Sequence, residues 1–375
     1  MTRGFILNQL LGHAAHGENL KAVLESRADF KYWVLEVPIE NAAPCSRERK
    51  SDVMLQVYLD TLRSLMSRRY SAASLFFHTL DAALFCPHVV ARTPSVVSLD
   101  ATPLQLKNLS GYHQPLDRPL TIAERMKIAV LSSTRLKFRL TRRVLHAARQ
   151  IIAWSEWAKT SVVEDYGIDP RKVTCIPPGI DIQAFLPPRE RDGGPVKVLF
   201  VGGDLERKGG DLLLRWMRED GLDLGCELHL VTKSQIASSP GVFVHRDVAP
   251  NSERLTELFH KCQIFALPTR ADCSPIALME ALAAGLPAIS SNIAGIPEII
   301  RHDETGLMIN PDDYIGLSSA LRRLVLDADL RSKLGRAARL DAEARFSLRN
   351  YEALIDCFIE HTKSPRLVPQ LNAAH

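Results

Sequence analysis

The chain lacks the features that mark membrane proteins, disulfide scaffolds and zinc proteins. In its 375 residues, no apolar run approaches the length of about 18 residues that a membrane span needs. Its seven cysteines are scattered and include no Cys-x-x-Cys pair, which is typical of reduced thiols. The apolar stretch near the N-terminus is short and is soon followed by polar residues, so we expect no secretory signal. These absences predict a soluble, cytoplasmic protein.

An excess of one charge is also missing. The sequence has 47 Lys and Arg against 43 Asp and Glu, and a net charge of +4 does not by itself indicate a nucleic-acid partner. The charged fraction of 24% and the hydrophobic fraction of 46% are ordinary for globular proteins, which excludes the disordered and fibrous classes. A chain of this length is expected to fold as two domains.

Short apolar or β-branched runs alternate with helical patterns along the whole chain. This alternation favours an α/β fold, with parallel sheets covered by helices on both faces. We expect twelve strands, at 5–7, 32–37, 73–78, 95–99, 151–154, 173–176, 196–201, 227–231, 242–244, 264–267, 288–290 and 306–309. Twelve strands are too many for one doubly wound sheet, and the Pro-, Gly- and charge-rich segment 181–195 is the best linker between two.

A single carboxylate, Glu280, lies among apolar residues in a helical pattern. An ionised carboxylate in such a setting is costly unless something pairs with it. We expect this helix to have Ser274 as its N-cap and Pro275 at its first position, and to end at Gly285. Its free N–H groups would attract an anion, above all phosphate. Glu280 is therefore either paired with an internal Lys or Arg, or is part of a ligand site.

A glycine turn opens the second half of the chain. A predicted buried strand runs into Gly202 and Gly203, and Lys208 follows. Glycines let a backbone approach an anion, and lysine adds a cationic charge. The same pattern also fits a tight turn with solvated cations. A second carboxylate, Asp272, lies eight residues before Glu280. Together, the glycine turn, Asp272 and Glu280 predict complementary parts of one site for a diphosphate and a ribose.

Together these segments resemble the donor-binding half of family 4 glycosyltransferases, which are retaining enzymes. The family signature joins a glycine turn and a lysine to a Glu-x7-Glu motif and an Ala-x-x-x-Gly-x-Pro run. Here the signature reads Asp272-x7-Glu280, followed by Ala281 to Pro287. The similarity continues through residues 155–158, 177–181, 295–298, 303–307 and 345–347.

The resemblance implies a fold and an activity. The fold is α/β of the GT-B type, with two Rossmann-like domains whose parallel sheets face a central cleft. Residues 1–180 would bind the acceptor and residues 181–347 the donor, and a helix at about 348–375 would cross back to the first domain. The implied reaction moves a sugar from a UDP- or GDP-sugar to a glycan, lipid-linked or small-molecule acceptor, with retention at the anomeric carbon. No metal, other cofactor or nucleic acid is implied.

The resemblance also implies roles for single residues. Glu280 would bind the donor ribose hydroxyls, and Asp272 would lie beside the transferred sugar. Lys208, with the backbone N–H groups of Cys273 and Ser274, would hold the diphosphate as charge builds on it. The other donor-binding residues implied are Gly202, Gly203, Arg207, Pro275 and Ile276.

Two positions depart from the family pattern. Asp272 stands where the family has a longer glutamate, and Gly203 stands where an arginine is common. Our hypothesis is that Arg207 supplies the missing charge.

Candidate acceptor-side residues come from the first half. Asp100 follows the predicted strand 95–99 and is expected to orient the acceptor or the sugar, so that Asp100, Asp272 and Lys208 form the catalytic group. A turn cap is the alternative for Asp100. Acceptor binding is assigned to Gly12, His13 and His16 in the first loop and to His78 at a strand end. Surface histidines, and a core histidine at position 78, are the alternatives; the spacing of His13 and His16 does not define a metal site.

Two further patterns bear on partners. The segment 125–149 holds eight basic residues and no acid, interleaved with apolar residues. It fits peripheral contact with an anionic membrane, a frame for a polyanionic acceptor, or a solvated helix face. Asp327-Ala328-Asp329 spells the DxD motif that binds metal in another glycosyltransferase fold, but it lies in a surface helical pattern, so we expect no metal there.

Two rival functions remain open at this stage. One is a GT-B nucleotide-sugar epimerase, which would consume donor without an acceptor. The other is a non-catalytic nucleotide-sugar-binding protein, which the departures at Gly203 and Asp272 would fit.

Overall fold

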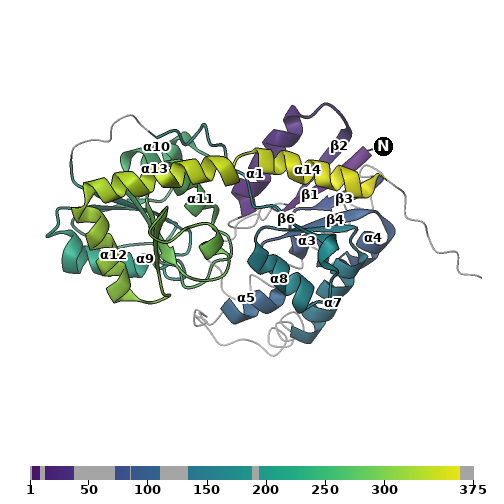
Figure 1. Cartoon of the computed structure of the whole chain (residues 1–375), viewed down its shortest axis with the longest axis horizontal. Helices are drawn as coiled ribbons and strands as arrows, with labels where there is room; N and C mark the ends of the chain where they lie inside the picture. Colours follow the sequence, from purple (N-terminus) through teal and green to yellow (C-terminus); the bar gives the residue numbers. More distant parts are fainter. Residues whose placement is uncertain are drawn as a thin grey trace, which may run out of the picture.

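The computed structural model consists of two α/β units that lie side by side along the long axis of the molecule (Figure 1). The structure describes residues 2–8, 13–37, 72–84, 86–109, 134–187 and 194–363. Among these residues, no helix is both long enough and apolar enough to cross a bilayer.

The N-terminal unit is built on a six-stranded parallel sheet with strand order β2-β1-β3-β4-β5-β6. Its strands are β1 (Thr2–Asn8), β2 (Lys31–Val37), β3 (Ser74–Phe77), β4 (Ser95–Leu99), β5 (Gln150–Ala153) and β6 (Val173–Cys175). Its helices are α1 (His13–Ser26), α3 (Leu80–Leu84), α4 (Pro87–Arg92), α5 (Pro103–Leu109), α7 (Thr134–Ala147) and α8 (Glu156–Glu164), with a 3-10 turn η2 (Pro170–Lys172). Strands β3, β4 and β5 are buried throughout, as expected of a sheet covered on both faces.

The C-terminal unit repeats this design with strand order β12-β11-β10-β7-β8-β9. Its strands are β7 (Lys197–Val201), β8 (Glu227–Val231), β9 (Val242–His245), β10 (Ile264–Leu267), β11 (Ala288–Ser291) and β12 (Gly306–Ile309). Its helices are α9 (Gly210–Trp216), which continues as the π-helical η3 (Met217–Gly221), α10 (Glu253–Lys261), α11 (Ile276–Ala283), the 3-10 turn η4 (Ile296–Glu298), α12 (Tyr314–Leu326) and α13 (Ala328–Arg345). Every one of the twelve predicted strands overlaps one of these twelve.

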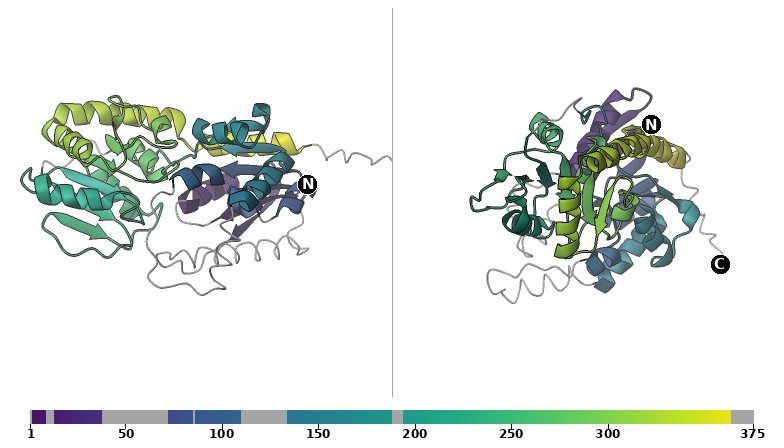
Figure 2. Two further views of the ribbon diagram at one scale, coloured as in Figure 1. Left: turned by 90° about the horizontal axis from the view of Figure 1, so that it is seen from below. Right: turned by 60° about the vertical axis from the view of Figure 1, so that its left-hand side comes forward.

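The last helix, α14 (Arg349–Thr362), leaves the C-terminal unit and packs on the N-terminal one (Figures 1 and 2). Figure 2 shows it in yellow over the purple and blue elements of the N-terminal sheet. It adds Tyr351, Leu354, Ile355 and Phe358 to a buried cluster that contains Phe5 of β1 and Phe76 of β3. Chain segments from both ends of the sequence therefore form one hydrophobic core.

Two chain segments cross between the units and bond to each other. The backbone N–H of Ile180 donates to the carbonyl of Phe346 at 2.7 Å, and the Asn350 amide donates to the Pro177 carbonyl at 3.2 Å. The two crossings are therefore tied together at one place between the units.

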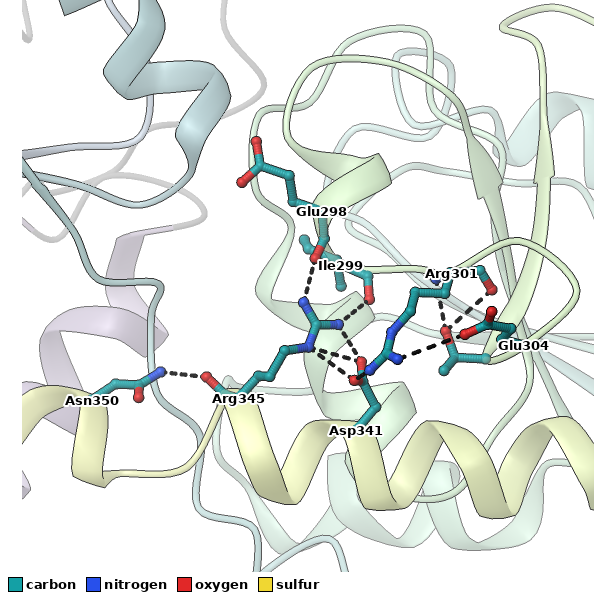
Figure 3. A network of polar contacts seen from close by, with 8 residues as sticks. Glu298, Ile299, Arg301, Glu304, Asp341, Arg345 and Asn350 are labelled. Carbon is teal, nitrogen blue, oxygen red and sulfur yellow. Dashed lines mark hydrogen bonds and ion pairs between the residues drawn. The ribbon is translucent and has the colours of Figure 1, made fainter.

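An ionic network holds the second crossing in place (Figure 3). Asp341, whose side chain is 3% exposed, pairs with both Arg301 and Arg345. The Arg345 guanidinium also donates to the carbonyls of Glu298 and Ile299, at 2.5 and 2.9 Å. The end of α13 is thereby fixed to the loop that follows β11.

Candidate functional site

The glycine turn after β7 lies directly against the loop after β10. Gly202 donates its N–H to the carbonyl of Val231 at 2.9 Å, and the backbone N–H of Arg270 donates to the Arg207 carbonyl at 2.9 Å. Gly209 has φ +77, and a Cβ there would collide with the carbonyl oxygen of Pro268. The turn therefore requires glycine at position 209, which the sequence analysis did not single out.

Lys208 and Asp272 meet at this junction. The Lys208 Nζ lies 2.6 Å from Asp272 Oδ2, and each side chain is 16% exposed. Burial pushes the pKa of Asp272 upward, but the charges of Lys208 and Arg207 outweigh burial and leave this pKa below its ordinary value. The two residues come from the carboxyl ends of β7 and β10, where an open α/β sheet binds its ligands.

Arg207 lies beside this pair but is engaged elsewhere. Its Nη1 donates to the carbonyl of Ala271 at 2.5 Å, and its Nε lies 3.3 Å from Asp204 Oδ2. One third of its side chain is exposed, so its positive charge is open to solvent at the rim of the turn. No Cβ contact within 4 Å would restrict a side chain at Gly203, which is open space.

The helix α11 begins one residue later than predicted. Pro275, with φ −67 and ψ 117, is the N-cap, and Ile276 is the first helical residue, because the extended ψ of Pro275 keeps it out of the helix. The prediction of Ser274 as N-cap was therefore wrong. Gly285, with φ +67, follows the helix and ends it as predicted.

The N–H groups before this helix are partly engaged within the loop. The Cys273 N–H donates to Asp272 Oδ1 at 3.1 Å, and the Cys273 carbonyl accepts from the Gly295 N–H at 3.1 Å. Ser274 is buried and lies against Gly295. The loop is therefore fixed on both sides before α11 begins.

Glu280 is buried inside α11 with only 3% of its surface exposed. Burial raises its pKa from an ordinary value of 4.5 to about 7. Within the described part of the chain, no Lys or Arg forms an ion pair with it. The internal ion pair considered from the sequence is thus not found among these residues.

His13 and Asp100 face each other in the N-terminal unit. Asp100 follows β4, and its Oδ2 lies 3.9 Å from His13 Nε2, with the two side chains 26% and 21% exposed. Asp100 also lies close to the donor-side loop, because its charge, after burial, is the largest cause raising the pKa of the Cys273 thiol. Residues at the carboxyl ends of both sheets therefore lie near one another.

His16 and His78 lie beneath His13 and are almost fully buried, at 1% and 0% exposure. Their rings contact through His78 Nε2 and His16 Nδ1 at 2.5 Å, and His16 stacks on Trp154 at 4.2 Å. Burial, then the charges of His78 and His13, lower the pKa of His16 well below its ordinary value. Both side chains are buried in this structure, and their assignment to acceptor binding stays a prediction.

The first predicted loop is also corrected. The chain is helical from His13 onward, because α1 runs from His13 to Ser26. Residues three apart on a helix share a face, so the spacing of His13 and His16 already indicated a common direction. Gly12 lies outside the described residues.

Sequence reasoning missed one acidic residue on this side. Asp81, in the first turn of α3, has a pKa raised by burial and by the charge of Asp100, while His13 opposes the shift. It follows His78 by three residues, so its position after a strand end was the available clue.

Three side chains join the two units next to this site. The Glu298 carboxylate accepts from the backbone N–H groups of Glu156 and Trp157, both at 2.7 Å, at the start of α8. Asn251 Nδ2 donates to Asn19 Oδ1 at 3.0 Å, and Asn19 in turn donates to the Gly179 carbonyl at 3.1 Å.

The described part of the basic segment is the helix α7. Arg135, Arg139, Arg142 and Arg143 are exposed on it, and no ion pair to them is formed within the described residues. Residues 125–133 lie outside the described residues. In the DxD string, Asp327 is the N-cap of α13 and accepts from the Leu330 N–H at 2.8 Å.

Two family models match consecutive parts of the chain. "Glycosyltransferase Family 4" matches residues 41–184, and "Glycosyl transferases group 1" matches residues 181–341. The chain belongs to the group 1 / family 4 glycosyltransferases. The family suggested by the glycine turn and the Asp272-x7-Glu280 motif is confirmed.

A curated relative and two solved structures extend this result. The D-inositol 3-phosphate glycosyltransferase of Xylanimonas cellulosilytica is 25% identical over 257 residues, which are 59% of this chain and 59% of the relative. The match thus spans about three fifths of the relative's length. Sucrose-phosphate synthase from Thermosynechococcus elongatus superposes with a TM-score of 0.73 at 14% identity, over 96% of this chain and 98% of that one. HepE from Anabaena, in complex with UDP and glucose, superposes with a TM-score of 0.66 at 14% identity, over 96% and 99%. The predicted GT-B fold is confirmed.

Proposed function

We propose that the chain transfers a sugar from a nucleoside-diphosphate sugar to an acceptor hydroxyl. The observation that carries this proposal is the Lys208–Asp272 pair, 2.6 Å apart at the carboxyl ends of two adjacent strands. A cation there stabilises the negative charge that builds on a departing diphosphate. The complexes of HepE with UDP and with UDP-glucose support a nucleotide-sugar donor for this fold.

In the proposed reaction the configuration at the anomeric carbon is retained. The acceptor oxygen bonds to the anomeric carbon on the face from which the diphosphate leaves, and the bond between that carbon and the diphosphate oxygen breaks. The acceptor proton passes to the departing diphosphate oxygen, so no enzymic nucleophile is needed. Lys208 and backbone N–H groups near the start of α11 hold the leaving group, and Asp272 lies beside the sugar.

Under this proposal, Glu280 binds the ribose hydroxyls of the donor. A buried carboxyl without a cationic partner gains most from accepting hydroxyl hydrogen bonds, because these satisfy it without a charge. The proposal assigns charge neutralisation at the diphosphate to Lys208 and Arg207, so it requires no metal ion. EDTA should then leave turnover unchanged.

On the acceptor side, the proposal keeps Asp100 and His13. Both are partly exposed, and Asp100 lies close enough to the donor loop for its charge to act on Cys273, so an acceptor hydroxyl between Asp100 and His13 would face the sugar. Under this proposal residues 1–180 bind the acceptor and residues 181–347 bind the donor. The acceptor is a glycan, a lipid-linked sugar or a small molecule.

A nucleotide panel tests the donor assignment. Ligands that bind only the folded state raise its apparent stability, by about 2.7 kcal/mol at a hundredfold excess over Kd. UDP, GDP and their sugars should therefore raise the unfolding temperature, whereas Lys208→Met should lose most of this increase. A wild-type chain that responds to none of them would contradict the proposal.

Product analysis separates the proposal from its rivals. Slow release of nucleoside diphosphate with a released or transferred sugar supports a transferase. An epimerase would consume the donor without any acceptor and yield an altered sugar. A binding protein would bind the donor and release nothing.

We also propose that α7 contacts an anionic membrane surface. Its exposed arginines have no acidic partner among the described residues, and exposed Leu136 lies among them. Each cation near an anionic surface contributes about 1 kcal/mol. Co-sedimentation with phosphatidylserine vesicles at low salt should fall on Arg139→Glu/Arg143→Glu and not on Arg218→Glu, an exposed arginine of the C-terminal unit. Equal binding by all three proteins would contradict membrane contact through α7.

A further inference from the structure

Arg270 makes an unusual set of contacts two residues before Asp272. Its side chain is 13% exposed, and its Nη1 and Nη2 donate to the two carboxylate oxygens of Asp211, at 2.6 and 2.8 Å. Its Nε donates to Asp312 Oδ1 at 2.5 Å, and its Nη1 also donates to the Glu206 carbonyl. One side chain thus engages two carboxylates and a backbone carbonyl.

Arg270 and its partners come from three segments at one edge of the C-terminal sheet, those that follow β7, β10 and β12. Glu206 and Asp211 flank Lys208, in the turn after β7 and the first turn of α9. Asp312 lies between β12 and α12, and Arg270 itself follows β10. The guanidinium therefore sits where the segment carrying Lys208 meets the segment carrying Asp272.

The position of the Lys208 ammonium group depends on how well its backbone segment is held. A lysine is a flexible point charge on a long stem, so its position follows from the backbone that carries it. The turn that carries Lys208 includes the left-handed Gly209 and is anchored to the β10 loop by the backbone bond from Arg270 to Arg207. Besides the guanidinium, that backbone bond, the bonds from Thr269 and Arg207, and the Lys208–Asp272 pair itself join the two segments.

We propose that Arg270 is a positioning residue that holds Lys208 in place beside Asp272 and thereby sets the affinity for the donor diphosphate. This inference rests on the proposed function of the Lys208–Asp272 site. Lysine cannot replace Arg270, because the forked contact to Asp211 and the contact to Asp312 need planar, diverging N–H groups.

The energetics favour positioning over bulk stability. Asp211 and Asp312 are 40% and 62% exposed, so solvent screens both ion pairs and limits what they contribute to folding, least for the bidentate contact to Asp211. The two parallel hydrogen bonds from Arg270 to Asp211 nevertheless fix the distance and the angle between the segments that carry these two residues. A diphosphate site requires such fixed geometry.

Nucleotide binding to full-length variants tests the inference. Titration calorimetry with UDP and GDP should show binding to Arg270→Met weakened about tenfold or more, and to Arg270→Lys nearly as much. Asp211→Asn, which keeps the arginine but loses the charged fork, should fall between. Arg323→Met is the matched control, because Arg323 pairs with Asp303 at 2.8 Å in the same unit and both are half-exposed. This control should bind like the wild type.

A double-variant comparison separates positioning from a general loss of structure. In a Lys208→Met background, Arg270→Met should weaken binding less than about twofold further, because the cation that it positions is already gone. Equal factors in both backgrounds, or wild-type affinity in Arg270→Met, would overturn the inference.

A ligand-free measurement keeps the two proposals distinguishable. NMR titration of the Asp272 carboxyl carbon should show a higher pKa in Arg270→Met, since Lys208 no longer stays close, and no change in Arg323→Met. If the wild type binds neither UDP nor GDP, the proposed function fails. The Asp272 titration then still tests whether Arg270 positions Lys208. An Asp272 pKa that is the same in Arg270→Met and in the wild type would reject this role.

Discussion

At the scale of single residues, the buried carboxyl of Glu280 is a costly feature of the C-terminal unit. It is 3% exposed and forms no ion pair within the described residues, so burial alone raises its pKa to about 7. A protein accepts such a cost where a ligand later satisfies the group. The structure therefore predicts how the stability of the ligand-free protein depends on pH through Glu280.

The unfolding free energy should fall as pH rises from about 4.5 to above 7 because of Glu280. Its pKa is higher in the folded state, so the folded state holds the proton more tightly, and this stabilisation is complete below 4.5 and lost above 7. The shift corresponds to about 3 kcal/mol. Urea unfolding at pH 5 and pH 8 should show Glu280→Gln gaining up to this amount relative to the wild type as pH rises.

An exposed glutamate supplies the control for that measurement. Glu352→Gln, on the outer face of α14, should change stability equally at both pH values. A difference between Glu280→Gln and the wild type that stays constant with pH would show that Glu280 does not titrate in this range.

Several site residues were predictable because their chemistry is local in the sequence. Lys208 follows a strand and a glycine turn, and Asp272 precedes an apolar helix, so strand ends alone brought them to one edge. Arg270 and Asp81 were not predictable in this way, because their roles arise from partners that are distant in sequence or lie on other elements. A core position was one alternative for His78, whereas the burial of His16 could not be predicted, since it depends on Trp154 and Tyr351 from elsewhere in the chain.

At the scale of elements, two glycines of the turn after β7 differ in how well they tolerate a side chain. Gly209→Ala should lower the unfolding free energy by at least about 2 kcal/mol, because an L-residue is strained at φ +77 and its Cβ meets the Pro268 carbonyl. Gly203→Ala should change it by less than about 0.5 kcal/mol, because no atom lies within 4 Å of its added Cβ. Urea unfolding of both variants measures the difference, and equal losses would contradict this account of the turn.

The start of α8 depends on a residue from the other unit. Glu298 accepts two backbone N–H bonds of 2.7 Å there, and a negative charge at a helix N-terminus contributes about 0.3–1 kcal/mol. Glu298→Ala should therefore speed hydrogen exchange at Glu156 and Trp157. The Ala158 amide is the internal control, because Ser155 of the same unit caps it at 3.1 Å. Faster exchange at all three amides would mean that α8 unfolds as a whole.

Element types were easier to predict than element ends. All twelve strands were anticipated, because the strands of covered parallel sheets form short apolar or β-branched runs. The start of α1 was mistaken for a loop, since His13 to Asn19 carries polar residues and glycine that become buried only through the other elements packed on them. The start of α11 was displaced by one residue because the extended ψ of Pro275 is a backbone property that the sequence does not show.

At the scale of the whole molecule, the N-terminal unit depends on the last helix of the chain. Phe358 of α14 is fully buried, and its ring lies 5.2 Å from that of Phe5 and 5.8 Å from that of Phe76. The core under β1 and β3 is therefore completed only after the entire C-terminal unit has been made. Both crossings and the Arg345–Asp341 network fix where α14 begins.

Phe358→Ala should destabilise the N-terminal unit selectively. Removing a fully buried phenylalanine costs about 3–5 kcal/mol, and the cavity would open between α14 and the N-terminal sheet. Hydrogen exchange should therefore lose protection in β1, β3 and β4, while β7 and β10 keep theirs. Leu326→Ala, on an exposed side chain of α12, should leave both sheets unchanged. If protection were lost only within α14, the helix would pack on the N-terminal sheet without stabilising it. Loss across the N-terminal sheet would mean that the two ends of the chain fold as one core.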